Sequence, residues 1–195
     1  MGKTAGVCLI EVGPAERMES LVDALMGVWR SSVEATHDFL SPAEVDAIAE
    51  YVPGALREIP RLVVALAGGA GEEAAGADVS ADGAVGAGAG GTDGRAAGFG
   101  EGCAGGSLCP VAFAGVADDS LEMLFVAPDM RGWGVGGRLL RHAIEQLGVH
   151  RLDVNEQNPQ ARGFYEHEGF RVVGRSETDA QGGPYPILHM ELARA

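Results

Sequence analysis

Basic side chains are scarce in this 195-residue chain, which has 14 lysines and arginines against 28 aspartates and glutamates and a formal net charge of −14. Nucleic acids and anionic membranes attract proteins through cationic surfaces, so this balance argues against both as the main partner. An acidic surface agrees better with a cationic or amine-bearing substrate.

Long apolar runs and a basic-then-apolar leader are also missing. No stretch approaches the roughly 18 apolar residues of a membrane-spanning helix, and the N-terminus lacks the pattern of a secretory signal. Cysteine is rare: Cys8, Cys103 and Cys109 are odd in number and have no metal-binding spacing, so we expect reduced thiols and no metal site. Together these absences predict a cytoplasmic protein.

One segment differs from the rest in composition. Of the 39 residues from 68 to 106, 15 are glycine and 11 are alanine. Such a segment has little side-chain area to bury and much backbone entropy to lose, so we expect a disordered loop. Closing a long loop costs only about 0.6 kcal/mol per doubling of its length. We therefore place 68–106 as an insertion in a β-hairpin of residues 61–67 and 110–116, within a single domain over 1–195.

Apolar periodicity predicts the remaining elements. Helices are expected at 16–33, from Ser41 onward, at 138–148 and from Asn158 to about Gly169. Strands are expected at 7–12, 61–67, 110–116, 121–126, 151–155, 170–176 and 185–192. This order predicts a mixed α/β (α+β) fold, with a mostly antiparallel sheet that contains one parallel crossover from 121–126 to 151–155.

The central stretch 121–148 reads as a buried strand, a glycine-dense turn and an amphipathic helix. Glycines let backbone N–H groups approach a ligand, and the first turn of the helix directs unpaired donors and its positive dipole end to the same place. The stretch therefore predicts an anion site that suits a phosphate, with an ordinary helix-start turn as the alternative.

Two linked motifs, about twenty residues apart, resemble the signature of GNAT-type N-acetyltransferases. They consist of Arg131, Gly132, Trp133, Gly134, Val135 and Gly136, followed by Asn155, Asn158, Ala161, Phe164, Tyr165, Glu166, Gly169 and Phe170. The stretch from Trp29 to Leu40 is also similar to the small bacterial YjaB-like subgroup. The resemblance implies a GNAT-like mixed sheet, flanked by helices, whose parallel strand pair splays apart to admit acetyl-CoA.

The same resemblance implies where acetyl-CoA binds. The glycine loop would hold its pyrophosphate, the backbone of the preceding strand would pair with the pantetheine arm, and two asparagines would bind its amides. For Asn158 a plain helix-cap role is an equal alternative. The expected cofactor-binding residues are Leu124, Phe125, Val126, Arg131, Gly132, Trp133, Gly134, Val135, Gly136, Asn155 and Asn158.

Four further residues are candidates for the chemistry. Tyr165 is the family's usual general acid, since a phenol stays protonated at the pH where a thiol ionises. Glu122 shares the face of Leu124 and is the candidate base, acting through a water, while Asp153 would face the cleft and favour a cationic amine. His37 is a tentative substrate residue. Three of them have plain alternatives: core packing for Tyr165, a charge on an exposed strand end for Glu122, and a structural or solvated position for His37.

The sequence therefore predicts an N-acetyltransferase that moves an acetyl group from acetyl-CoA to a primary amine of a small molecule or protein, with a homodimer as a common state of the family. A non-catalytic acetyl-CoA sensor is the main alternative. A dinucleotide-binding oxidoreductase is a weaker one: Gly132, Gly134 and Gly137 match its fingerprint and Asp153 lies about 20 residues on, but the repeated βαβ units are missing.

Overall fold

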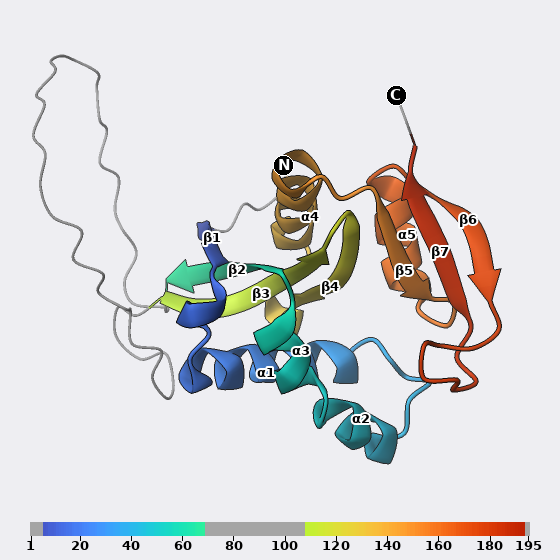
Figure 1. Cartoon of the computed structure of the whole chain (residues 1–195), viewed down its shortest axis with the longest axis horizontal. Coiled ribbons are helices and arrows are strands. Elements are labelled where there is room, and N and C mark those ends of the chain that lie inside the picture. Colours follow the sequence, from blue (N-terminus) through green and yellow to red (C-terminus); the bar gives the residue numbers. More distant parts are fainter. Residues whose placement is uncertain (1–5, 69–107, 194–195) are drawn as a thin grey trace, which may run out of the picture.

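A computed structural model describes residues 6–68 and 108–193, in which a seven-stranded sheet lies between two layers of helices (Figure 1). The strands are β1 (Val7–Val12), β2 (Arg61–Gly68), β3 (Leu108–Ala117), β4 (Ser120–Val126), β5 (Arg151–Asn155), β6 (Phe170–Ser176) and β7 (Ile187–Leu192). The helices are α1 (Glu19–Glu34), α2 (Pro42–Ala49), α3 (Val52–Glu58), α4 (Val135–Leu147) and α5 (Pro159–His167), with 3-10 turns at Pro14–Glu16 and Pro128–Met130.

The strand order is β1-β2-β3-β4-β5-β7-β6, and β4–β5 is the parallel pair among otherwise antiparallel neighbours. This confirms the predicted mixed, mostly antiparallel fold. A doubly wound sheet would require several parallel neighbours, so the dinucleotide-binding alternative is wrong.

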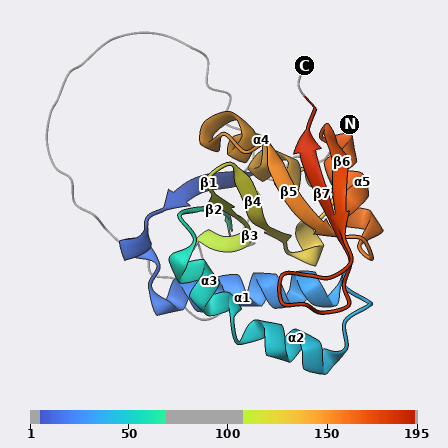
Figure 2. The same cartoon turned by 45° about the vertical axis from the view of Figure 1, so that its right-hand side comes forward.

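Helices α1, α2 and α3 lie on one side of the sheet, and α4 and α5 lie on the other (Figures 1 and 2). Each side has its own apolar core. Strand β2 contributes side chains to both cores, because successive side chains of a strand point to opposite faces of the sheet. Val63 and Ala65 pack toward α4, whereas Leu62 and Val64 pack toward α1.

Strands β2 and β3 form the predicted hairpin. Their pairing runs from Arg61 opposite Val116 to Gly68 opposite Leu108. The predicted insertion 68–106 lies outside the described residues, except for Gly68 itself. The two strand ends that flank it are therefore neighbours in the sheet.

The second predicted helix is two helices in the structure. Ser41 begins α2 with the expected reciprocal cap, in which its hydroxyl accepts from the Glu44 N–H and its own N–H donates to the Glu44 carboxylate at 2.8 Å. The helix ends at Ala49, and α3 starts afresh with Pro53 in its first turn. Proline has no N–H for an intrahelical bond but fits a first turn, which explains the break.

The expectation that the thiols are all reduced is wrong, as Cys109 shows. Cys8 on β1 is free and exposed, but Cys109 at the start of β3 is disulfide-bonded. An odd number of cysteines still allows one pair, and the fold, which decides which sulfurs approach each other, determines whether it forms.

Candidate functional site

The two parallel strands separate soon after they begin. Strands β4 and β5 pair only at Ser120 with Arg151 and at Leu121 with Leu152. On its other edge, β4 pairs with β3 through Leu121 and Met123, so that Glu122 between them has no direct partner and forms a bulge. A bulge bends its strand, which is the local reason that β4 turns away from β5.

A cavity of about 490 Å³ lies beside the end of β4. It contacts both layers of the fold: His37 follows α1 on one side, and Val135 opens α4 on the other. The sequence-predicted residues that line it are His37, Leu124, Phe125, Val126, Arg131, Gly132, Gly134, Val135, Gly136, Asn158 and Tyr165.

The cavity also has lining residues that were not predicted as site residues. These are Ser32, Thr36, Met130, Gly137, Arg141, Gln160, Ala161, Phe164 and Glu168. Among them, Gly137, Ala161 and Phe164 belong to the motifs named above. Arg141 adds a positive charge to the cavity and Glu168 a negative one. Arg141 could have been predicted from helical spacing, because it lies on α4 one turn after Gly137 and so on the same face. Glu168 has no such signal, because it follows the last residue of α5.

The glycine loop has the backbone conformation that its composition predicts. Gly132 and Gly134 have φ values of 77° and 76°, in the left-handed region that side chains with a Cβ rarely adopt. Gly134 directly precedes α4, so the unpaired N–H groups of the first helical turn face the cavity end of the helix. A Cβ on Gly136 would lie 3.5 Å from Val126 and 3.6 Å from Phe164, so a bare backbone leaves room here for a ligand.

The guanidinium of Arg131 connects the loop to α1. It lines the cavity, and its Nη2 donates to the carbonyl and to the hydroxyl of Ser32, both at 3.1 Å. Arg131 thus holds the end of α1 against the loop while it contributes positive charge to the cavity.

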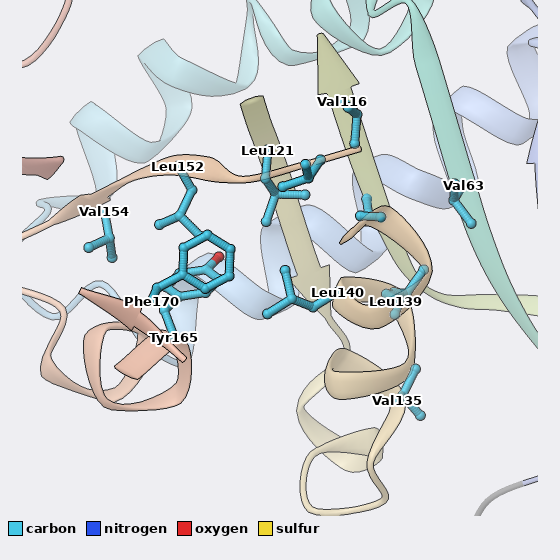
Figure 3. Packing of buried hydrophobic residues seen from close by; sticks show 14 of the residues in the cluster. Val63, Val116, Leu121, Val135, Leu139, Leu140, Leu152, Val154, Tyr165 and Phe170 are labelled. Atoms are coloured by element: carbon cyan, nitrogen blue, oxygen red, sulfur yellow. The ribbon is translucent and has the colours of Figure 1, made fainter. Parts of the chain in front are cut away.

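Tyr165 packs in the core and also lines the cavity. Tyr165 is 8% exposed, and its ring lies 6.1 Å from that of Phe170 (Figure 3). The ring of Phe164 lies 5.2 Å away on its own helix, α5. Burial raises the pKa of its phenol above the ordinary value, because the ionised form loses its solvation. The hydroxyl is therefore protonated at any physiological pH, as a proton donor must be.

His37 lines the cavity from the connection that follows α1. Burial lowers the pKa of its imidazole, and the charge of Arg131 acts in the same direction. The ring lies 5.2 Å from Phe39, whose ring lies 5.9 Å from Tyr185 of the loop between β6 and β7. Tyr185 in turn donates to the Glu44 carboxylate on α2. These contacts join the α1–α2 connection to the β6–β7 loop beside the cavity.

Three predicted cofactor residues have local partners. Asn158 is buried, and its side chain caps α5 by accepting from the Ala161 N–H at 3.0 Å, although it also lines the cavity. The Asn155 side chain accepts from the Gln157 N–H at 2.8 Å. Trp133 packs against the α4 core. Neither Asn155 nor Trp133 is among the residues that line the cavity.

Glu122 and Asp153 occupy matching places on the two diverging strands. Each lies one residue beyond the last β4–β5 pair, and neither lines the cavity. Glu122 is exposed on its bulge. Asp153 instead contacts His189 on β7, with 2.7 Å between its Oδ1 and the ring Nδ1.

Two features are absent from the residues that the structure describes. Within 6–68 and 108–193, no group of three or more histidine, cysteine, aspartate or glutamate side chains could hold a metal ion. In the same part of the chain, no helix has both the length and the hydrophobicity to cross a bilayer.

Comparison with known proteins identifies relatives over most of the chain. A family model described as "Acetyltransferase (GNAT) domain" matches residues 85–172. "Peptidyl-lysine N-acetyltransferase YjaB" of Salmonella typhimurium is 34% identical, with 86% of this chain and 89% of the relative covered. The Escherichia coli protein of the same name is 32% identical, with 89% and 91% covered.

Solved structures agree with this relationship. The solution structure of apo-form YjaB from Escherichia coli has a TM-score of 0.67 at 31% identity, and the match covers 97% of this chain and 99% of that one. The PaiA N-acetyltransferase of Thermoplasma acidophilum, solved in complex with coenzyme A, shares the fold, with a TM-score of 0.57 at 16% identity and 95% and 99% covered. The splayed parallel pair, the glycine loop before α4 and the identity with these relatives together show that this chain belongs to the GNAT family of N-acetyltransferases and is an acyltransferase.

Proposed function

We propose that this protein transfers the acetyl group of acetyl-CoA to a primary amine by direct attack, and that the amine is a lysine side chain of a protein or peptide. One observation carries the proposal: a single cavity brings together the glycine loop that opens α4, the end of β4 and the hydroxyl-bearing ring of Tyr165. An anion site, a strand end and a proton donor are the parts that acyl transfer from a coenzyme thioester requires.

The lining residues fit acetyl-CoA. The first-turn N–H groups of α4 would bind its pyrophosphate, and Arg131 and Arg141 would add positive charge near it. The main chain from Leu124 to Val126 would bind the pantetheine arm, with Asn155 and Asn158 as further amide partners. When bound, acetyl-CoA supplies a thioester carbonyl that an amine attacks.

Two residues would move protons. Tyr165 would donate its phenolic proton to the leaving sulfur, and its raised pKa keeps the phenol protonated before the reaction. An amine with a pKa near 10 must also lose a proton before it can attack. Glu122, at the bulge where β4 leaves β5, would accept that proton through a water.

The acceptor class rests on the relatives and on charge. Both YjaB proteins are named peptidyl-lysine N-acetyltransferases. A lysine side chain is cationic, and this chain has a formal net charge of −14, which favours association with a positive acceptor. His37, beside the cavity end under α1, would contact the acceptor.

Calorimetric titration with acetyl-CoA, followed by an amine panel read by free-thiol release, tests the proposal. We expect saturable binding of the coenzyme and thiol release with an α-amino-blocked lysine peptide above the rate with a spermidine or free amino acid control. Binding without thiol release from any amine would contradict the transferase assignment and support the sensor alternative. Release with spermidine but not with the peptide would contradict the acceptor class alone.

A further inference from the structure

Three side chains from neighbouring strands form a hydrogen-bonded row on the exposed face of the sheet. Asp153 on β5 contacts His189 on β7, and the Nε2 of that ring lies 2.8 Å from the hydroxyl of Ser176 on β6. Both ring nitrogens of His189 thus have partners. The site described above uses neither His189 nor Ser176.

The row determines how the imidazole is held. A carboxylate only accepts hydrogen bonds, so the 2.7 Å contact requires a proton on Nδ1, which donates to Oδ1 of Asp153. In the neutral ring, Nε2 then accepts from the Ser176 hydroxyl. Two contacts fix the plane of the ring, and the ring fixes the carboxylate of Asp153. Its second oxygen has no partner among residues 6–68 and 108–193.

Asp153 lies where the parallel strands part. Leu152 is the last residue of β5 that pairs with β4, and it is buried with Val154 in the core below α4. Side chains of a strand alternate between faces, so Asp153 points to the opposite face. That is the side of the sheet on which α1 lies, and Ser32 of α1 and His37 just after it both line the cavity.

Stability does not account for this arrangement. The side chains of Asp153 and His189 are 63% and 40% exposed, and an exposed ion pair contributes only about 0–1 kcal/mol. Two other charged residues lie near Asp153 in the sheet. Arg151 pairs with Asp119 at 2.8 Å, and Glu191 lies opposite Arg151 in the β5–β7 register, at the end where β4 and β5 are still paired.

We propose that His189 is a positioning residue, which holds the carboxylate of Asp153 at the branch of the two parallel strands so that it binds the ammonium group of a cationic acceptor. This inference rests on the proposed function. It assigns acceptor binding, and not coenzyme binding, to the His189–Asp153 pair, with Ser176 as the residue that orients the ring.

Two substitutions at one position separate this role from a general structural one. His189→Asn places an amide N–H near the position of Nδ1 and keeps a donor for Asp153, whereas His189→Leu removes it. For an α-amino-blocked lysine peptide, we expect His189→Leu to raise KM by about tenfold or more, as the loss of a charge-assisted contact does. His189→Asn should stay within about threefold of the wild type. The KM for acetyl-CoA should not change in either.

A double-mutant cycle and a carboxylate control complete the kinetic test. Asp153→Asn should raise the peptide KM as His189→Leu does, and the double variant should add little, because both remove one unit. Glu191→Gln removes a carboxylate from the same strand face and should leave both KM values unchanged. Additive effects of the two single variants, or an effect of Glu191→Gln as large as that of Asp153→Asn, would overturn the proposal.

A spectroscopic measurement on the free protein is independent of turnover. In ¹⁵N-histidine NMR spectra, with the His189 signals assigned by their loss in His189→Asn, the wild type should show the Nδ1-protonated tautomer. Asp153→Asn should shift the ring toward the other tautomer.

The outcomes distinguish this inference from the proposed function. If the wild type acetylates the peptide and His189→Leu leaves the peptide KM unchanged, this inference is wrong while the proposed function stands. If no amine releases thiol, the proposed function fails, and an unshifted tautomer would still refute the pairing.

Discussion

Arg17 shows how a single residue can organise a corner of the fold. The residue is 6% exposed, and its guanidinium has no carboxylate partner in the part of the chain that the structure describes. It donates instead to main-chain carbonyls of Val12, Leu56, Arg57, Ile59 and Pro60. Burial lowers the pKa of this guanidinium, but the group stays charged because arginine titrates so high. The residue joins the end of β1 to the segment after α3.

Arg17→Met should therefore be strongly destabilising. The substitution keeps much of the apolar stem but leaves several buried carbonyls without a donor, at a cost of about 3 kcal/mol in the free energy of unfolding. Urea denaturation measures it. Arg162→Met is the matched control. The Arg162 guanidinium pairs with the exposed Glu166 carboxylate at 2.8 Å, and its loss should cost less than about 0.5 kcal/mol. Equal losses in the two variants would contradict this reading of Arg17.

Tyr165→Phe should separate chemistry from binding. The ring packing against Phe164 and Phe170 is kept, so stability and the Kd for acetyl-CoA should change little. Loss of the proposed proton donor should lower kcat by roughly 100-fold. Thiol release measures kcat, and calorimetry measures Kd. An unchanged kcat with the same amine would remove Tyr165 from the proton-donor role.

Glu122→Gln tests the proposed base. A base works only when deprotonated, so kcat/KM of the wild type should fall as the pH is lowered through the pKa of that group. The amide cannot accept the proton, and the variant should lose this acid limb together with roughly 100-fold in rate. The measurement is kcat/KM for the lysine peptide across pH. A variant that keeps the same acid limb would show that another group is the base.

At the scale of elements, the start of α4 and the end of β4 make the cavity together. The helix begins at Val135, three residues before the start at Arg138 that the apolar pattern predicts. The residues between are Gly136 and Gly137, whose lack of side chains weakens the periodic signal. Their helical conformation matters because it places the first-turn donors directly after the left-handed residue Gly134.

Gly136→Val should block the coenzyme without unfolding the protein. A Cβ at this position meets Val126 and Phe164 at ordinary contact distances, so the backbone tolerates it, but the two methyl groups enter the cavity. We expect the Kd for acetyl-CoA to rise by at least about tenfold. Gly163→Ala on α5 is the control: no atom lies within 4 Å of its Cβ, so it should raise stability by about 0.5–1 kcal/mol and leave Kd unchanged. Unaltered binding by Gly136→Val would show that the coenzyme does not approach this turn.

The whole molecule has a seam where β4 and β5 separate. Two residue pairs join these strands, whereas β2 and β3 pair over eight positions from Arg61 to Gly68. The carbonyl and N–H groups that β4 no longer shares with β5 are available to a ligand, which is unusual for a central strand. We therefore expect the middle of the sheet, at this seam, to be the surface that binds the coenzyme.

Deletion of residues 70–104 tests the domain assignment at this scale. The hairpin that flanks the segment is paired up to Gly68 and Leu108, and the glycine- and alanine-rich composition of the segment offers little side-chain area to bury. We therefore expect the melting temperature, measured with reductant in both samples, to change by less than about 4 °C, which corresponds to about 1 kcal/mol or less. A much larger drop would show that the segment contributes to the folded core.

Local chemistry explains which elements could be predicted. The cap at Ser41, the glycine turn before α4 and the alternation of Arg151–Asn155 act within a few residues, so their patterns are visible in the chain. The split between α2 and α3 was missed because a proline can start a helix as well as interrupt one. The partners of Arg131 and Asp153 were missed because Ser32 and His189 lie 99 and 36 residues away.

The sequence by itself determined the fold class, the glycine loop and the resemblance to the GNAT family, because hydrophobic period, turn chemistry and motif spacing are local properties. Only the tertiary structure decided that Tyr165 lines the same cavity as the loop, that Arg131 holds α1, that Cys109 is oxidised and that Asp153 meets His189. Each of these depends on how strands and helices that are distant in the sequence align with one another. The packing of the whole core sets that alignment, and no short stretch of sequence encodes it.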